Sequence, residues 1–194
     1  VLTQCGIGKV SAAVGASELI RRFAPDCVVS TGVAGGIDTC LRVTDVVASE
    51  RLVYHDVWCG DDNKYGQVQG FPAVYEGCPA LLKHALSLNG AGMESHIHSG
   101  LVCTGDKFIT NRTELGAIKR RFPDGLAVDM ESAAIAQACY LYNTPFLSFR
   151  IISDTPGVED HASQYADFWG MMAERSFLTT WTFLSTLPTE IDTY

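Results

Sequence analysis

The sequence predicts an α/β fold in a single domain, with a sheet covered by helices on both faces to give three layers. The 194 residues fit one domain, since domains usually contain about 50 to 250 residues. Hydrophobic residues make up 47% of the chain and charged residues 19%, which supplies a core and excludes long disorder. Short β-rich runs also alternate with amphipathic helical stretches, and this alternation is typical of α/β sheets.

The first helix is expected from Lys9 to Phe23, directly after the glycine turn Gly6-Ile7-Gly8. Its apolar residues recur on one side at helical spacing, as in an amphipathic helix. A strand from Cys27 to Thr31 follows and ends in a second glycine-rich turn, Gly32 to Gly36. Neither glycine turn matches a phosphate-binding motif, so we expect no nucleotide-phosphate cradle.

The other elements follow from the same two periodicities. Further strands are expected at Val43–Tyr54, Ile97–Thr104, Leu126–Met130 and Pro145–Ile152, and further helices at Ala80–Leu88, Glu114–Arg121, Glu131–Tyr142 and Tyr165–Leu184. Ligands of such sheets bind beyond the carboxyl ends of the strands. Candidate functional residues are therefore sought at those ends.

Charge and cysteine content exclude several classes of protein. The 14 basic and 22 acidic residues give a net charge of −8, which disfavours a nucleic-acid partner. No apolar run approaches the ~20 residues of a membrane span, and the first residues lack the pattern of a signal peptide. The seven cysteines are odd in number and show no CxxC spacing, so we expect reduced thiols in the cytoplasm. His96 and His98 lack a third ligand, so we expect no metal.

A carboxyl group ends the most apolar strand. Asp154 follows Ser153 there, and an acid beside an apolar wall can have a raised pKa and act as a general acid. Because a proline lies two positions further on, Asp154 is also compatible with a turn or a helix cap, which are commoner roles than that of a catalytic acid.

A second acidic site lies at a strand-to-helix junction. If Asp129 and Glu131 are both extended, their carboxylates share one face, with Met130 opposite, and suit sugar hydroxyls. The alternative is that one of them meets the helix N-terminal dipole. After another strand, Phe108 and Ile109 offer an aromatic ring and backbone amides to a base, although Phe108 is also a typical core residue.

These segments, in this order, resemble the purine nucleoside phosphorylase/uridine phosphorylase superfamily. The greatest similarity is to its hydrolase branch, the methylthioadenosine/S-adenosylhomocysteine nucleosidases. The resemblance extends over nearly the whole chain and is carried by Gly6–Ala16, Ser30–Asp38, Val46–Asp56, Tyr65–Ala73, Thr104–Ile109, Ala127–Ala136 and Phe149–Asp154. It implies a mixed central sheet and a small nucleoside as substrate, with no metal or organic cofactor.

The resemblance also implies residue roles. Asp154 would protonate N7 of adenine, with Ser153 holding it, while Phe108 stacks on the base and the Ile109 backbone reads its edge. Glu131 would accept hydrogen bonds from the ribose hydroxyls. Met130 would contact the ribose, and Asp129 corresponds to a second acidic position of the family. Arg150 would lie near the attacking water, and Ile7 and Tyr165 would form walls of the pocket. In a homodimer, Phe71 and Pro72 would contribute to the pocket of the partner.

Two departures from the family pattern matter. About forty N-terminal family positions, with the acid that activates water, have no counterpart in residues 1–194, and we expect them upstream because the sheet would otherwise lack a strand. Val33 replaces a serine whose hydroxyl helps phosphorylases hold phosphate, which weakens phosphorolysis. The alternatives to adenine nucleoside hydrolysis are a nucleoside phosphorylase, a futalosine-type hydrolase and a catalytically weak nucleoside-binding protein.

Overall fold

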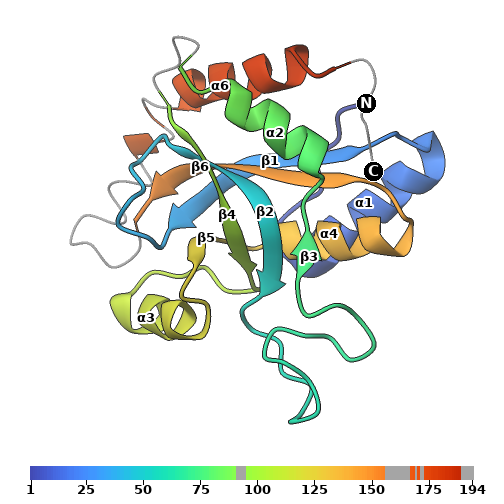
Figure 1. Cartoon of the computed structure of the whole chain (residues 1–194), viewed down its shortest axis with the longest axis vertical. Helices are drawn as coiled ribbons and strands as arrows, with labels where there is room; N and C mark the ends of the chain where they lie inside the picture. Colours follow the sequence, from blue (N-terminus) through green and yellow to red (C-terminus); the bar gives the residue numbers. More distant parts are fainter. Residues whose placement is uncertain (91–94, 156–166, 169, 171–172, 189–194) are drawn as a thin grey trace.

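A computed structural model describes residues 1–90, 95–155, 167–168, 170 and 173–188 (Figure 1). Strands and helices alternate along most of these residues, as the periodicity predicts. The strands are β1 (Val28–Gly36), β2 (Val46–Tyr54), β3 (Tyr75–Glu76), β4 (Ile97–Thr104), β5 (Gly125–Asp129) and β6 (Phe146–Asp154), and the helices are α1 (Lys9–Phe23), α2 (Pro79–Ser87), α3 (Arg112–Arg121), α4 (Ser132–Leu141) and α6 (Ala173–Ser185).

One mixed sheet forms the centre, in the order β3-β2-β4-β5-β1-β6. Strands β2, β4 and β5 run parallel, whereas β1 is antiparallel to β5 and parallel to β6. The sheet also curls, because β6 pairs a second time with β2, antiparallel, at Val46↔Ile151. This closure brings the ends of distant strands to one side of the molecule.

Helices cover both faces of the sheet, as the sequence predicts. Helices α1 and α4 pack on one face through small residues such as Ala12 and Ala134. Helices α2 and α6 cover the other face (Figure 1), where Leu81 of α2 and Phe183 of α6 belong to one core cluster with Phe149 of β6. Every residue of β6 is buried, which explains its continuous apolar sequence.

The glycine-rich segment after the first strand differs from the prediction. Gly32 to Gly36 do not form a turn but continue β1 to its end. Glycine is needed in this part of β1 because side chains of β6 pack directly against its backbone. A Cβ at Gly32 would collide with the Arg150 guanidinium, and one at Gly36 would lie 3.2 Å from Ile152. Only part of the last expected helix, α6, lies in the described residues, and Tyr165 lies outside them. None of the helices described is long and apolar enough to cross a membrane.

An ion pair fastens α3 to the loop after β1. The Lys119 ammonium lies 2.5 Å from the Asp38 carboxylate and also donates to the Gly125 carbonyl. The hydrogen bond from Lys119, aided by the Cys40 amide, lowers the pKa of Asp38 from 3.8 to about 2. A carboxyl group with a lowered pKa stabilises the folded state above its unfolded pKa and stops doing so as pH falls through the folded value.

We therefore predict that Asp38→Asn lowers the free energy of unfolding at pH 7. The difference from wild type should shrink as the pH falls from about 4 towards 2, because the wild-type carboxylate is then protonated as well. Urea unfolding across this pH range measures it. A difference that stays constant down to pH 2 would contradict the assignment.

Candidate active site

A cavity of about 750 Å³ opens at the ends of β5 and β6, beside β1. It gathers the candidate residues that the sequence places on different elements. Those lining it are Ile7, Phe108, Ile109, Asp129, Met130, Glu131, Arg150, Ser153 and Asp154. Because these residues are separated by up to about 150 positions in the chain, their convergence makes this cavity the candidate active site.

The acid at the end of β6 is buried in the cavity wall. Asp154 is 3% exposed and lies beside Gly35 of β1 in the parallel pairing. The Ser153 hydroxyl donates to the Asp154 carboxyl group at 2.5 Å and lies 3.4 Å from the Ala34 carbonyl. Strand pairing and this hydroxyl thus fix the carboxyl group at the cavity surface.

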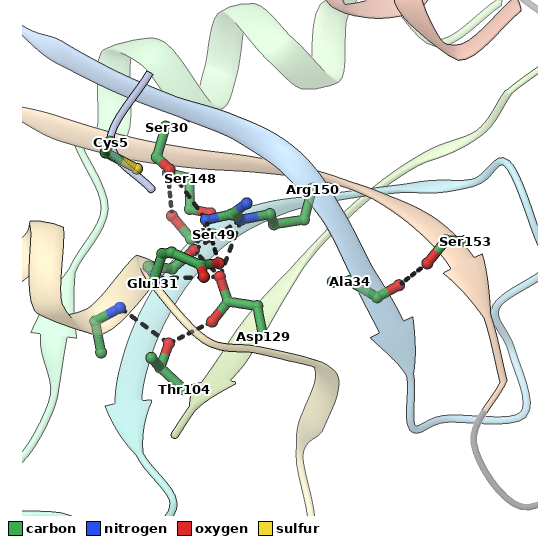
Figure 2. A network of polar contacts seen from close by, with 12 residues as sticks. Cys5, Ser30, Ala34, Ser49, Thr104, Asp129, Glu131, Ser148, Arg150 and Ser153 are labelled. Atoms are coloured by element: carbon green, nitrogen blue, oxygen red, sulfur yellow. Dashed lines mark hydrogen bonds and ion pairs between the residues drawn. The ribbon is translucent and has the colours of Figure 1, made fainter. Parts of the chain in front are cut away.

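Arg150 is the central cation of the site (Figure 2). It is 4% exposed, and its Nε lies 2.9 Å from the Asp129 carboxylate and 3.0 Å from the Ser132 hydroxyl. Its Nη2 donates to the Ser30 hydroxyl at 3.1 Å and lies 3.7 Å from Glu131. A buried guanidinium is tolerated only with such partners.

The carboxylate of Asp129 is fully occupied by the protein. It accepts hydrogen bonds from the Thr104 hydroxyl at 2.5 Å, the Ser132 amide at 3.1 Å and the Ser132 hydroxyl, besides pairing with Arg150. A carboxylate offers about four acceptor positions, and all are used. Asp129 therefore meets the N-terminus of α4, which is the alternative left open by the sequence.

Glu131 differs from Asp129 in both backbone and environment. Strand β5 ends at Asp129, and Glu131 has φ −130° and ψ −39° at the start of α4, so the two acids do not share one extended strand face. Glu131 accepts a hydrogen bond from the Gly8 amide at 3.0 Å and keeps part of its carboxylate accessible to the cavity. It is the carboxylate that remains available to a ligand.

Phe108 presents a ring to the cavity and is not a core residue. Its side chain is 53% exposed, whereas its neighbour Ile109 is buried against Ile118 and other apolar groups. Phe71 and Pro72 are half-buried and do not line the cavity of their own chain; Phe71 instead contacts Tyr140 of α4, with the rings 6.4 Å apart.

The histidine pair lies away from the cavity. The rings of His96 and His98 are 4.5 Å apart, and His98 pairs with Asp45 at 3.2 Å. Across the described part of the chain, no three His, Cys, Asp or Glu side chains are grouped to hold a metal ion.

A family model described as the phosphorylase superfamily matches residues 1–185. The chain belongs to this superfamily. Among curated relatives, the 5′-methylthioadenosine/S-adenosylhomocysteine nucleosidase of Chromohalobacter salexigens is 44% identical over 84% of this chain and 70% of its own length.

Solved nucleosidase structures agree with the superfamily assignment. The enzyme of Colwellia psychrerythraea in complex with adenine has a TM-score of 0.86 and 36% identity, covering 94% of this chain and 76% of its own. The Neisseria meningitidis nucleosidase with methylthio-immucillin-A has a TM-score of 0.88 and 35% identity, over 94% and 79% of the two chains. The mixed sheet with flanking helices is thus the nucleoside phosphorylase-like fold.

Several residues of this candidate site are not indicated by the sequence. Ser30, Thr104 and Ser132 hold the Arg150–Asp129 pair from three elements. Their only signal in the sequence is a hydroxyl at or near a strand end, within an apolar run. The sequence pattern places Gly32 in a turn, whereas in the structure it leaves space for the Arg150 side chain.

We predict that Gly32→Ala lowers the free energy of unfolding by about 1 to 3 kcal/mol, because the added methyl group displaces a buried guanidinium that is paired with Asp129. Urea unfolding measures the change. Gly116→Ala is the matched control: it adds a methyl group inside α3 next to the flexible end of Arg120 and should stabilise by up to about 1 kcal/mol. Equal effects at both glycines would contradict the close packing around Arg150.

Proposed function

We propose that this protein is an N-glycosyl hydrolase that releases adenine from 5′-methylthioadenosine, S-adenosylhomocysteine or a related adenine nucleoside. The observation that carries the proposal is one cavity lined by both Asp154 and Glu131, with the Phe108 ring beside them. An acid for the base and a carboxylate for the sugar both assist cleavage of an N-glycosidic bond, because each stabilises charge that develops as the bond breaks. The nucleosidase relatives, one of them bound to adenine, support this substrate class.

On the base side, the leaving adenine accumulates negative charge as the bond breaks. Asp154 donates a proton to N7 and removes that charge, while Ser153 keeps the carboxyl group in place. The exposed Phe108 ring stacks on the purine, and the backbone at Ile109 reads its edge. Both contacts hold N7 against the acid.

On the sugar side, the ribosyl ring becomes positively charged. Glu131 accepts hydrogen bonds from the ribose hydroxyls and stabilises this cation, with Met130 packed beside the ring. Arg150 lies behind Glu131, at the family position near the attacking water. Ile7 forms a wall of the cavity, and Tyr165 is expected to form another.

Electrostatics favour water over phosphate as the nucleophile. Asp129 balances the positive charge of Arg150, and the carboxylate of Glu131 lies 3.7 Å from the same guanidinium. One cation and two carboxylates together carry a net negative charge. Val33 lines the cavity where phosphorylases carry a hydroxyl, and it donates no hydrogen bond. Lys107 also lines the cavity but is paired with Glu114, so a dianion would meet little uncompensated positive charge.

We further propose a homodimer in which Phe71 and Pro72 complete the partner's pocket. Helix α1 exposes Val10 and Val14, at 75% and 64%, on a helix that packs on α4, and α4 exposes Tyr140 beside Phe71. Apolar surface of this kind is typical of obligate dimers.

The seven cysteines, all within the described residues, are free thiols, which supports a reducing compartment such as the cytoplasm.

The function is tested with full-length protein and 5′-methylthioadenosine in the absence of phosphate. We expect free adenine to appear at a rate that added phosphate does not raise, and no 5-methylthioribose-1-phosphate. Asp154→Asn should lower the rate by about 10²- to 10⁴-fold, the usual contribution of a general acid. Absence of adenine release would remove the proposal, and a variant with most of its activity would remove the role of Asp154.

The dimer is tested by Val14→Glu, which places a charge on the exposed apolar face of α1. We expect sedimentation to show a monomer and adenine release to fall, because Phe71 and Pro72 no longer reach a neighbouring pocket. Thr113→Glu, on exposed α3, is the control and should change neither. A fully active monomer would disprove the shared pocket.

A further inference from the structure

Three charged residues outside the catalytic groups form a closed ring at the start of α1. The Lys9 ammonium lies 2.9 Å from both carboxylate oxygens of Asp56 and 3.6 Å from Asp106. Asp56 in turn accepts the Asp106 amide at 2.8 Å, and Asp106 accepts the Lys9 amide at 2.7 Å. Each member therefore contacts the other two, across α1, the end of β2 and the end of β4.

The ring fixes the segment that carries Phe108. Residues 105–109 leave β4 towards the cavity, and the Gly105 amide donates to the Asp129 carbonyl at 3.0 Å. A Cβ at Gly105 would collide with the His55 ring, which is buried beneath it. Closer to the exposed Phe108 ring, Asp106 joins the segment to α1, and Lys107 joins it to α3 through an ion pair with Glu114.

Helix α1 is the fixed partner in this arrangement. Ala12, Ala16 and Ile20 bury its inner face against the core. Its N-cap is Gly8, which has no side chain to satisfy the first amides, so Asp106 accepts the Lys9 amide from 97 positions away. The neighbouring Gly8 amide donates to Glu131. The start of α1 thus touches both the base side and the sugar side of the cavity.

We propose that Asp106, with Lys9 and Asp56, is a positioning group that holds the Phe108–Ile109 segment at the distance from Glu131 that an adenine nucleoside requires. The inference rests on the proposed function, because it assigns the base to Phe108 and the sugar to Glu131. Asp106 does not touch the substrate in this account. It acts through the segment that follows it, while α1 and Glu131 stay in place.

The test compares Asp106→Ala with wild type in binding two fragments, adenine and 5-methylthioribose, by calorimetry on the full-length protein. Adenine affinity should fall about fivefold to tenfold, the scale of a lost helix cap, because the Phe108 segment loses its anchor to α1 and keeps only the Lys107–Glu114 pair and the buried Ile109. Affinity for 5-methylthioribose should stay within about twofold, because the core residues of α1 still hold the Gly8–Glu131 contact. Asp106→Asn keeps an acceptor oxygen and should recover part of the adenine affinity.

Asp124→Ala is the matched control, since it removes an ion pair of similar exposure, 51% against 48%, with Arg51 at 2.6 Å. It should leave both fragment affinities and adenine release unchanged. Adenine affinity equal to wild type in Asp106→Ala, or an equal loss for both fragments, would overturn the positioning role. Failure of wild type itself to bind adenine would instead overturn the proposed function.

Discussion

The ion pair between Arg150 and Asp129 is the interaction on which the site depends. Both groups are buried, so each has lost its hydration and must be compensated within the protein. The pair joins the end of β5 to the middle of β6, and the hydroxyls of Ser30, Thr104 and Ser132 supply further hydrogen bonds to the two groups. Removal of one partner of such a pair typically costs about 3 to 5 kcal/mol, because the other charge stays buried.

This rigid pair separates the groups that support the site from those that meet the ligand. Asp129 has no acceptor left, and its task is to hold Arg150 and the start of α4. Glu131, two positions later, leaves the strand and reaches the cavity. One sequence motif thus supplies a structural carboxylate and a functional one, and the difference between them arises from where β5 ends.

Much of this arrangement was predictable from local sequence. Apolar periodicity located β4 and α1, and the position of Asp154 and Phe108 after strands indicated a site at the strand ends. Local patterns could not reveal the β2–β6 pairing, which joins residues about a hundred positions apart. For the same reason the local pattern predicts a turn at Gly32: the side chain that excludes a Cβ there belongs to Arg150, on another strand.

The most direct test is the structure of the full-length protein with an unreactive adenine nucleoside bound. The account predicts the Asp154 carboxyl group within hydrogen-bond distance of the purine N7, the ribose hydroxyls on Glu131, and the Arg150–Asp129 pair intact behind them. A nucleoside bound with N7 directed at another side chain, or with its sugar away from Glu131, would contradict the account.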